Sequence, residues 1–302
     1  MSLVVVGSVA FDCIKTPNGR VVDALGGSAV HFALAARLFT ATRLVGVVGE
    51  DFPDEHRRLL LDRNVDIRGL ETVPGGLTFR WSGEYFNDMN SRQTLSVDLN
   101  VFENFRPVLP KSYTKAQFVF LANGTPSTQM SVLKQVEGKP FIMADTMDLW
   151  IQTHRSDLEQ LLRHIDGLVL NDEEAFLLSD FKNPVRAGEA ISKFGLKFLV
   201  IKKGEHGCII FHEGKQLQLP AYPLTEVIDP TGAGDSFAGG IMGFLASRGA
   251  VDLPSFKQAV AWGTVVASYC CEGYGVERVA ALDLDAARDR YRSYRQMLSI
   301  QE

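Results

Sequence analysis

The sequence predicts a three-layer α/β fold, in which helices cover both faces of a mainly parallel central sheet. Three observations predict it. Short, almost wholly apolar runs alternate with helical patterns, as a parallel sheet buried on both faces requires. Two aromatic and β-branched segments interrupt this alternation, and the last third of the chain is helical in pattern. With 302 residues the chain is at the upper end of what one core can hold, so we expect a single domain over residues 1–302.

The regular elements follow from the apolar spacing. The expected strands of the main sheet are 3–7, 43–48, 118–122, 141–144, 168–170 and 198–201. The expected helices are 28–39, 127–135, 155–163, 173–179, 185–194, 233–247, 254–271 and 283–298.

Two segments stand outside that alternation. Residues 78–86 and 93–100 alternate in part and are joined by a polar turn, which predicts an antiparallel hairpin. Residues 10–25 contain the turn Pro17-Asn18-Gly19 between two strand-like pieces. Together the segments at about 10–25 and 77–100 predict a small β lid, although each hairpin could equally extend the edge of the main sheet.

Composition and charge exclude several classes of protein. Lys and Arg total 31 against 36 Asp and Glu, and they form no long basic cluster, so we expect no nucleic-acid partner. The longest apolar stretches are far shorter than the roughly 20 residues that span a bilayer, so we expect no membrane partner. The N-terminus has no signal-peptide pattern, which favours a cytoplasmic protein. The four cysteines lack metal-ligand or disulfide-framework spacing.

The strongest chemical signal is residues 229–240, Asp-Pro-Thr-Gly-Ala-Gly-Asp-Ser-Phe-Ala-Gly-Gly. A strand-like piece at 226–228 runs into Gly232 and Gly234 and then into an apolar helix. Such glycines let backbone N–H groups face an anion, and the helix N-terminus adds its positive end. Asp235 would lie beside a bound phosphoryl group and could accept a proton from an attacking hydroxyl. Taken alone, Asp235 could equally be an acid that only favours the helix dipole.

This segment resembles the carboxyl-terminal signature of the PfkB, or ribokinase-like, family of sugar and nucleoside kinases, since every fixed position of Asp-x-Thr-Gly-Ala-Gly-Asp is matched. Residues 26–33, Gly-Gly-Ser-Ala-Val-His-Phe-Ala, resemble the family's amino-terminal diglycine signature, with His31 where the family usually has Asn. The resemblance runs from about residue 3 to about residue 298. It implies a ribokinase-like fold with a β lid.

The resemblance also implies roles for the matched positions. The catalytic set is the base Asp235 and the anion-hole residues Gly232, Ala233 and Gly234. The acceptor-binding set is Asp12, Gly26, Gly27 and His31. A carboxylate such as Asp12 suits a vicinal diol, because it accepts two hydrogen bonds. His31 could hydrogen-bond an acceptor hydroxyl or simply pack.

A second group of matched positions belongs to the nucleotide and its metal. Asn171 and Glu174 match the family's Asn-x-x-Glu motif, which organises Mg²⁺ and the phosphates largely through water, although alone the tetrapeptide would be a helix N-cap. Lys202 and Gly204 match the turn that borders the nucleotide, where Lys202 could contact a phosphate. Thr231 belongs to the same nucleotide- and phosphate-binding set, and with Asp229 it could also hold a monovalent cation. Asp145, at a strand end, is a further candidate.

The implied activity is transfer of the ATP γ-phosphoryl group, with Mg²⁺, to a hydroxyl of a sugar or nucleoside; we expect a primary hydroxyl. A flat base could stack on Phe79, Trp81, Tyr85 or Phe86 of the expected lid, although these could merely pack it. Three alternatives stay open: an adenosine-like nucleoside kinase specifically, a non-catalytic nucleotide or metabolite sensor on the same fold, and a hydrolase that uses Asp235 towards water. An apolar exposed face on the lid would favour a homodimer.

Overall fold

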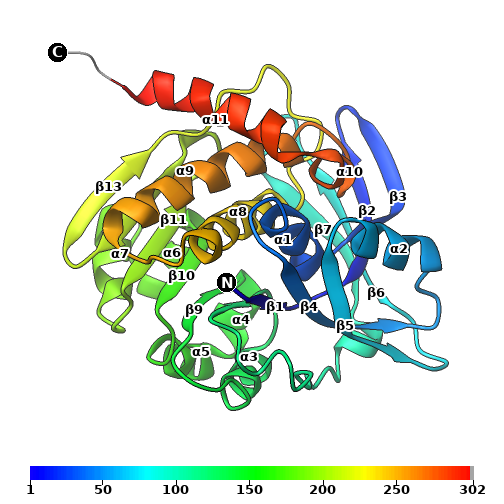
Figure 1. The fold of residues 1–302 in the computed structure, drawn as a ribbon. Coiled ribbons are helices and arrows are strands. Elements are labelled where there is room, and N and C mark those ends of the chain that lie inside the picture. The colour runs from blue at the N-terminus through cyan, green and yellow to red at the C-terminus, as the bar shows by residue number, and fades with distance from the viewer. Residues whose placement is uncertain (300–302) are drawn as a thin grey trace.

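The computed structural model describes residues 1–299, and a large sheet forms its middle layer (Figure 1). In chain order its strands are β1 (Leu3–Val6), β4 (Thr42–Gly49), β5 (Val65–Val73), β8 (Phe118–Leu121), β9 (Phe141–Asp145), β10 (Gly167–Asn171), β11 (Phe198–Lys202), β12 (Cys208–His212) and β13 (Lys215–Leu219). In space the order is β13-β12-β11-β10-β9-β8-β1-β4-β5. Neighbours from β11 to β5 are parallel, whereas β12 and β13 are antiparallel at one edge.

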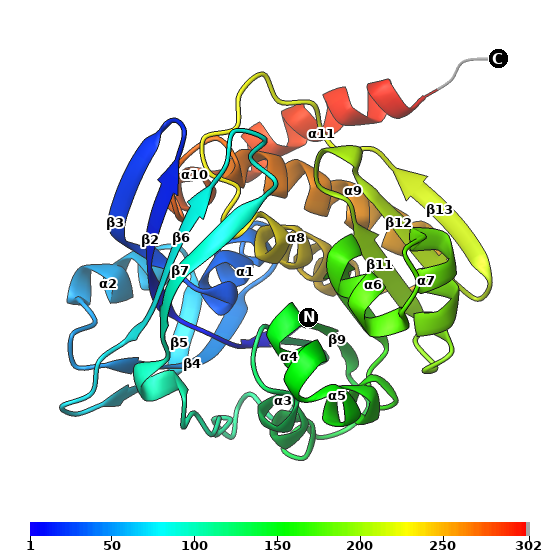
Figure 2. The ribbon, with the colours of Figure 1, turned by 180° about the vertical axis from the view of Figure 1, so that it is seen from behind.

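Helices form the two outer layers (Figures 1 and 2). One face carries α1 (Ser28–Ala36), α2 (Asp54–Asp62), α8 (Ala233–Arg248), α9 (Leu253–Cys270), α10 (Glu277–Ala281) and α11 (Leu284–Leu298). The other face carries α3 (Pro126–Leu133), α4 (Asp148–Thr153), α5 (Arg155–Leu162), α6 (Asp172–Ser179) and α7 (Pro184–Ser192).

Side-chain alternation along the strands divides the core in two. Leu3 and Val5 of β1 pack into the cluster beneath α1, α8 and α9, whereas Val4 and Val6 pack into the cluster beneath α5, α6 and α7. All four side chains are buried. Because both faces of the strand are covered, its sequence is apolar throughout, and the predicted three-layer arrangement is confirmed.

A second, smaller sheet stands beside the first (Figures 1 and 2). It contains β2 (Ala10–Thr16), β3 (Gly19–Gly26), β6 (Phe79–Tyr85) and β7 (Arg92–Asp98), in the order β3-β2-β6-β7. The two expected hairpins therefore join through the parallel pair β2/β6 and do not extend the main sheet. We call this four-stranded unit the small sheet.

The small sheet is anchored to the main sheet at Thr78, which is fully buried. The Asp51 carboxylate accepts hydrogen bonds from the Thr78 N–H at 2.7 Å and from its hydroxyl at 2.6 Å. The Gly49 N–H donates to the same hydroxyl at 3.0 Å, and Asn100 Nδ2 donates to the Thr78 carbonyl at 2.9 Å. One end of the small sheet is thus tied firmly to the end of β4.

One predicted strand is wrong. Residues 226–228 form no strand but an irregular segment between β13 and α8. The Ile228 N–H donates to the Cys271 carbonyl at 2.8 Å, so the backbone of this segment is satisfied by the end of α9 and not by a neighbouring strand. The expected helix at 28–39 also ends earlier, at Ala36. Within residues 1–299, each helix is too short or too polar to cross a membrane.

Candidate active site

Polar side chains gather where the central parallel strands end. Asp145, Asn171 and Lys202 are the last residues of β9, β10 and β11, which are neighbours in the sheet. The carboxyl ends of parallel strands meet at one edge, where ligands of open α/β sheets bind. The N-terminus of α8 lies against the same group, since a Cβ on Gly234 would lie 2.7 Å from the Lys202 Nζ.

The turn that leads into α8 requires glycine. Gly232 has φ 75° and ψ 0°, and the Ala233 N–H donates to the Pro230 carbonyl at 3.1 Å, which is the geometry of a type II turn. A Cβ on Gly232 would also lie 2.2 Å from Nδ1 of His31. Since the Ala233 N–H is used within the turn, the N–H groups of Gly234 and Asp235, in the first turn of α8, are those available to an anion.

Two contacts hold this turn in place. The buried Asp229 carboxylate accepts from the Thr231 N–H at 2.8 Å and from the Gly275 N–H at 3.0 Å. Burial raises the pKa of Asp229. From the other side, the Thr231 hydroxyl donates to the phenol oxygen of Tyr85 in the small sheet at 3.2 Å. The turn that leads into α8 is therefore fixed by Gly275, between α9 and α10, and by Tyr85 of the small sheet.

Asp235 and Asp145 face one another beside Lys202. Burial raises the pKa of Asp235, and the Lys202 ammonium opposes that rise. Burial, followed by the Asp235 charge, raises the pKa of Asp145 well above its ordinary value, and its Oδ1 has no hydrogen-bond partner. Burial therefore raises the pKa of both carboxyl groups, and the Lys202 ammonium opposes the rise for each of them.

Asn171 and Glu174 form a reciprocal capping box at the start of α6. Asn171 Oδ1 accepts from the Glu174 N–H at 2.8 Å, and Glu174 Oε2 accepts from the Asn171 N–H at 2.7 Å. The capping geometry left open by the sequence is thus present, and it holds both side chains at the edge of the sheet. Burial raises the pKa of Glu174, and Lys202 opposes that rise.

These oxygens fit a magnesium ion that keeps most of its own water. The second carboxylate oxygen of Glu174 lies outside the capping box, and the buried Asp145 Oδ1 has no partner. Both are hard oxygen ligands, which Mg²⁺ prefers. Residues 1–299 contain no cluster of three or more His, Cys, Asp or Glu side chains able to hold a metal, so phosphates and waters would complete the coordination.

Asp12 and the glycine pair meet on the small-sheet side. The Asp12 carboxyl lies flat against Gly26, because a Cβ there would fall 1.9 Å from its Oδ2. A Cβ on Gly27, which has φ 94°, would lie 2.5 Å from the Ser8 carbonyl oxygen. Burial, followed by the nearby charges of Asp229 and Asp235, raises the pKa of Asp12 to about 7. The structure therefore brings Asp12 and both glycines together near the catalytic turn.

His31 lies behind the anion-binding turn. Its side chain is 1% exposed, and its ring packs against Gly232 between α1 and α8. Nδ1 is 3.8 Å from the Cys270 sulfur, and Nε2 has no partner within the described chain. Burial lowers the pKa of His31 to about 4, so the imidazole is neutral. The sequence left open whether His31 contacts an acceptor hydroxyl or packs in the interior. Its surroundings in the structure are those of a packed side chain.

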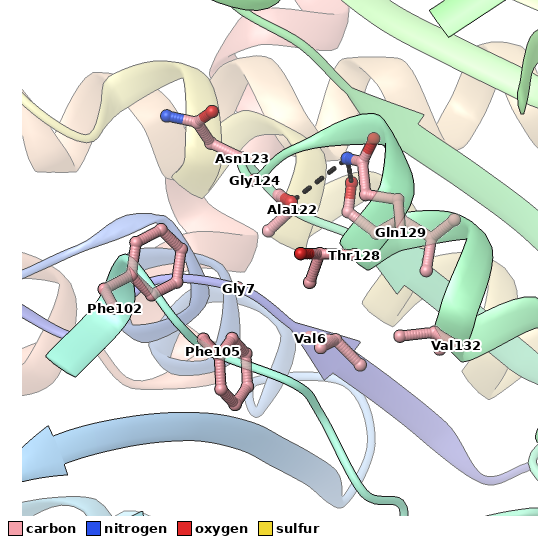
Figure 3. A pocket seen from close by; sticks show the side chains of 11 residues that line it. Val6, Gly7, Phe102, Phe105, Ala122, Asn123, Gly124, Thr128, Gln129 and Val132 are labelled. Atoms are coloured by element: carbon pink, nitrogen blue, oxygen red, sulfur yellow. Dashed lines mark hydrogen bonds between the residues drawn. The ribbon is translucent and has the colours of Figure 1, made fainter. Parts of the chain in front are cut away.

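A narrow crevice opens at the ends of β1 and β8 (Figure 3). Phe102, Phe105 and Thr128 stand around it, and Gly7 forms part of its floor. The chain passes from β1 to β4 on one side and later to β8 on the other, so the crevice lies at a topological switch point. Phe79 of the small sheet stacks on Phe102 with ring centroids 5.5 Å apart, which extends the aromatic wall.

The other aromatic residues of the small sheet have different surroundings. Trp81 covers Gly83, where a Cβ would lie 2.2 Å from the indole ring. Tyr85 is buried and contacts Thr231, whereas Phe86 is 48% exposed.

Arg92 is a site residue that sequence reasoning missed. It pairs with Tyr85 across the hairpin, and its charge opposes the rise in pKa of both Asp235 and Glu174. No motif marks it, because the side that a hairpin residue faces is known only once the register is known.

Comparison with known proteins shows that this chain is similar to carbohydrate and nucleoside kinases. The family model described as pfkB family carbohydrate kinase matches residues 1–280. A cytidine kinase of Thermococcus kodakarensis is 29% identical over 249 residues, which are 80% of this chain and 87% of that protein.

Solved structures share the fold. The nucleoside kinase of Methanocaldococcus jannaschii superposes with a TM-score of 0.78 at 21% identity, over 97% of this chain and 98% of that one. An Escherichia coli putative ribokinase II in complex with ATP and Mg²⁺ superposes with a TM-score of 0.78 at 19% identity, over 97% of this chain and 99% of that one. The predicted ribokinase-like fold is therefore confirmed.

Proposed function

The chain belongs to the pfkB family of carbohydrate kinases, and from this premise we propose that it transfers the γ-phosphoryl group of ATP to a primary hydroxyl of a nucleoside. The observation that carries the chemistry is the position of Asp235. This carboxylate stands in the first turn of α8, among N–H groups that are free to bind an anion and beside the Lys202 ammonium. A base and a phosphoryl-binding site thus occupy one helix terminus.

In the proposed reaction, Asp235 accepts the proton of the acceptor hydroxyl as its oxygen attacks the γ-phosphorus, and the bond to the β-phosphate oxygen breaks. The N–H groups of Gly234 and Asp235 bind the equatorial oxygens, where negative charge is spread in the transition state. Excluding water from the site suppresses hydrolysis of ATP.

The nucleotide side is proposed to run from Lys202 to Gly204. The Lys202 ammonium is placed at the α8 terminus, where it can contact a phosphate. Asn171 and Glu174 would hold Mg²⁺ through water, together with the free oxygen of Asp145. When bound, the ion neutralises phosphate charge and orients the γ-phosphoryl group. An ATP- and Mg²⁺-bound protein of the same fold supports this assignment.

On the acceptor side, Asp12 would accept hydrogen bonds from two neighbouring hydroxyls of the ribose, with Gly26 and Gly27 allowing close approach. The neutral His31 would act on the acceptor only through its unpartnered Nε2. The aromatic surface formed by the stacked rings of Phe79 and Phe102 would favour an acceptor that carries a flat base over a simple sugar. The similarity to a cytidine kinase supports the same choice, with a simple sugar as the second candidate.

Two further parts of the proposal concern a cation and assembly. Among the described residues, the buried carboxylate of Asp229 accepts hydrogen bonds from two N–H groups, and with Thr231 it would suit a monovalent cation. The dependence of kcat on K⁺ against Na⁺ at constant ionic strength tests the cation.

The small sheet exposes Val22, Leu95 and Val97, each at least 49% accessible, which supports a homodimer formed through this sheet. Light scattering tests the homodimer.

The decisive experiment measures phosphoryl transfer from Mg·ATP to a panel of ribonucleosides, ketoses and aldoses, with Asp235→Asn as the paired variant. We expect the highest kcat/KM with a ribonucleoside. If every acceptor is inert while nucleotide still binds, the protein is a sensor and the kinase proposal is wrong. If phosphate is released at the same rate without any acceptor, Asp235 serves hydrolysis. A ketose or aldose used better than every nucleoside would overturn the choice of acceptor only.

A further inference from the structure

The tip of the β6–β7 hairpin, residues 86–91, is a turn with a fixed shape. The Asp88 carboxylate accepts from the Asn90 N–H at 3.1 Å, from the Ser91 N–H at 2.9 Å and from the Ser91 hydroxyl at 2.6 Å. The Phe86 N–H donates to the Ser91 carbonyl at 3.0 Å, which closes the turn. With its backbone held in this way, the tip presents the Asn90 side chain outward.

Asn90 reaches the turn that follows β11. Its Nδ2 donates to Glu205 Oε2. Its Oδ1 fills the space beside Gly204, where a Cβ would lie 2.9 Å away, and Gly204 has φ 51°. Figure 2 shows the hairpin running from the anchored end of the small sheet towards this side of the molecule. The contact therefore joins the small sheet to the segment that begins two residues after Lys202.

The same end of the hairpin carries two side chains that face the catalytic residues. Tyr85, just before the tip, bonds Thr231, and Arg92, just after it, is the cross-strand partner of Tyr85. Every residue of β7 is exposed, so packing holds this strand weakly. The far end is anchored at Thr78, but the tip depends on the contacts of Asn90 and Tyr85.

We propose that Asn90 is a positioning residue: its contact with the Gly204–Glu205 turn closes the small sheet and sets Arg92 and Tyr85 over the transferring phosphoryl group. The inference rests on the proposed function, in which Lys202 and Gly204 border the nucleotide and the small sheet covers the acceptor. ATP and the nucleoside acceptor then favour the same closed arrangement of the small sheet. Each of the two therefore binds more tightly when the other is present. The Asn90–Glu205 pair carries that coupling from the turn after β11 to the hairpin tip.

The first test needs no acceptor. Hydrogen exchange of the full chain is followed with and without the non-hydrolysable analogue Mg·AMP-PNP. In the wild-type protein we expect AMP-PNP to slow exchange in both the 202–206 segment and the 86–98 hairpin. In Asn90→Ala the slowing persists at 202–206 and is lost at 86–98. Gln93→Ala, an exposed β7 position paired with Glu84, is the matched control and behaves as wild type.

A swap of donor and acceptor makes the test specific to this pair. Asn90→Asp places a second carboxylate against Glu205 and should lower kcat/KM roughly tenfold with Mg·ATP and the best nucleoside. Adding Glu205→Gln restores a donor opposite the new carboxylate and should recover most of that loss. Glu205→Gln alone keeps an acceptor oxygen and should have little effect.

The outcomes separate the two proposals. If AMP-PNP binds and protects 202–206 but leaves 86–98 unchanged in the wild-type protein, the coupling is wrong while the kinase proposal stands. If Glu205→Gln fails to improve Asn90→Asp, the pair does not position the hairpin. If AMP-PNP protects neither segment at any concentration, the nucleotide site itself is misplaced, and both proposals fail.

Discussion

The two walls of the site are built in opposite ways. The main-sheet wall consists of charged groups at the ends of buried strands, and its acids Asp145 and Glu174 have raised pKa values because they are removed from water. The opposite wall is the small sheet, whose outer strand β7 is exposed at every residue and which meets the catalytic turn through single side-chain contacts. The main-sheet wall is held by a core throughout. The small sheet reaches that core through side chains of β2 and β3 such as Phe11 and Leu25, whereas its outer hairpin is held by a few hydrogen bonds.

The two walls are therefore suited to two different tasks. A base and an anion site must keep their geometry during the reaction, and a buried, close-packed setting keeps it. A cover must open to admit substrates, and contacts worth only about 1 kcal/mol each allow that. Substitutions on the main-sheet wall should therefore remove catalysis, whereas those on the small sheet should reduce it gradually.

The largest effect is expected for Asp235→Asn. Without the carboxylate no group accepts the proton of the attacking hydroxyl, so kcat should fall by about 10³ while the Kd for Mg·ATP changes little. The control is Asp157→Asn, an exposed acid in the first turn of another helix, α5. Steady-state kinetics and calorimetry measure both quantities. Full activity of Asp235→Asn would show that its carboxylate serves only the helix dipole.

Gly232→Ala should rank second, because it adds strain and a collision. The left-handed backbone alone costs an alanine roughly 1–2 kcal/mol, and the new Cβ would also meet the His31 ring. Gly138→Ala is the control for backbone strain alone, since Gly138 has φ 83° and nothing lies within 4 Å of its Cβ position. Urea unfolding and kcat should both suffer more in Gly232→Ala. Equal losses in the two variants would mean that the His31 contact relaxes freely.

Acidification should weaken acceptor binding through Asp12. Its pKa of about 7 lies above the ordinary value, so the acceptor-binding carboxylate is present above pH 7 and is lost as the pH falls below it. The affinity for the nucleoside should drop about tenfold from pH 8 to pH 6. Calorimetry of binding, and not the rate, is the right measurement, since Asp235 also has a raised pKa. Asp12→Asn should bind weakly at every pH; an unchanged slope in that variant would assign the titration elsewhere.

The main-sheet wall and the small sheet also differ in how well they could be predicted from the sequence. The main-sheet elements were predictable because strands buried on both faces are apolar throughout, as in β1, and because glycines such as Gly232 mark a backbone that other residues cannot adopt. The exposed strand β7 carried a weaker signal, and the candidate site residue Arg92 on it carried none. Its role depends on pairing with Tyr85 and on where the hairpin folds back, both of which are set by tertiary contacts.

Two errors have related causes. The segment at 226–228 has the β-branched residues of a strand, but its N–H groups find the end of α9, which no local pattern reveals. The expected anion hole included the Ala233 amide, yet its N–H closes the Pro230 turn. Local sequence predicted that a glycine turn would bind an anion; only the backbone hydrogen bonds show which amides remain for it.

The smallest effect is expected for Tyr85→Phe, which tests the weaker wall directly. The change removes the oxygen that accepts from the Thr231 hydroxyl at 3.2 Å and leaves the buried ring in place. A hydrogen bond of this kind is worth about 1 kcal/mol, so kcat should fall roughly two- to fivefold. Tyr113→Phe is the matched control, because its hydroxyl donates to the Asp66 carbonyl at 3.1 Å away from the site. That variant should lose stability and keep its kcat. A fall in Tyr85→Phe as large as in Asp235→Asn would mean that the small sheet is part of the rigid catalytic framework, and the contrast between the two walls would not hold.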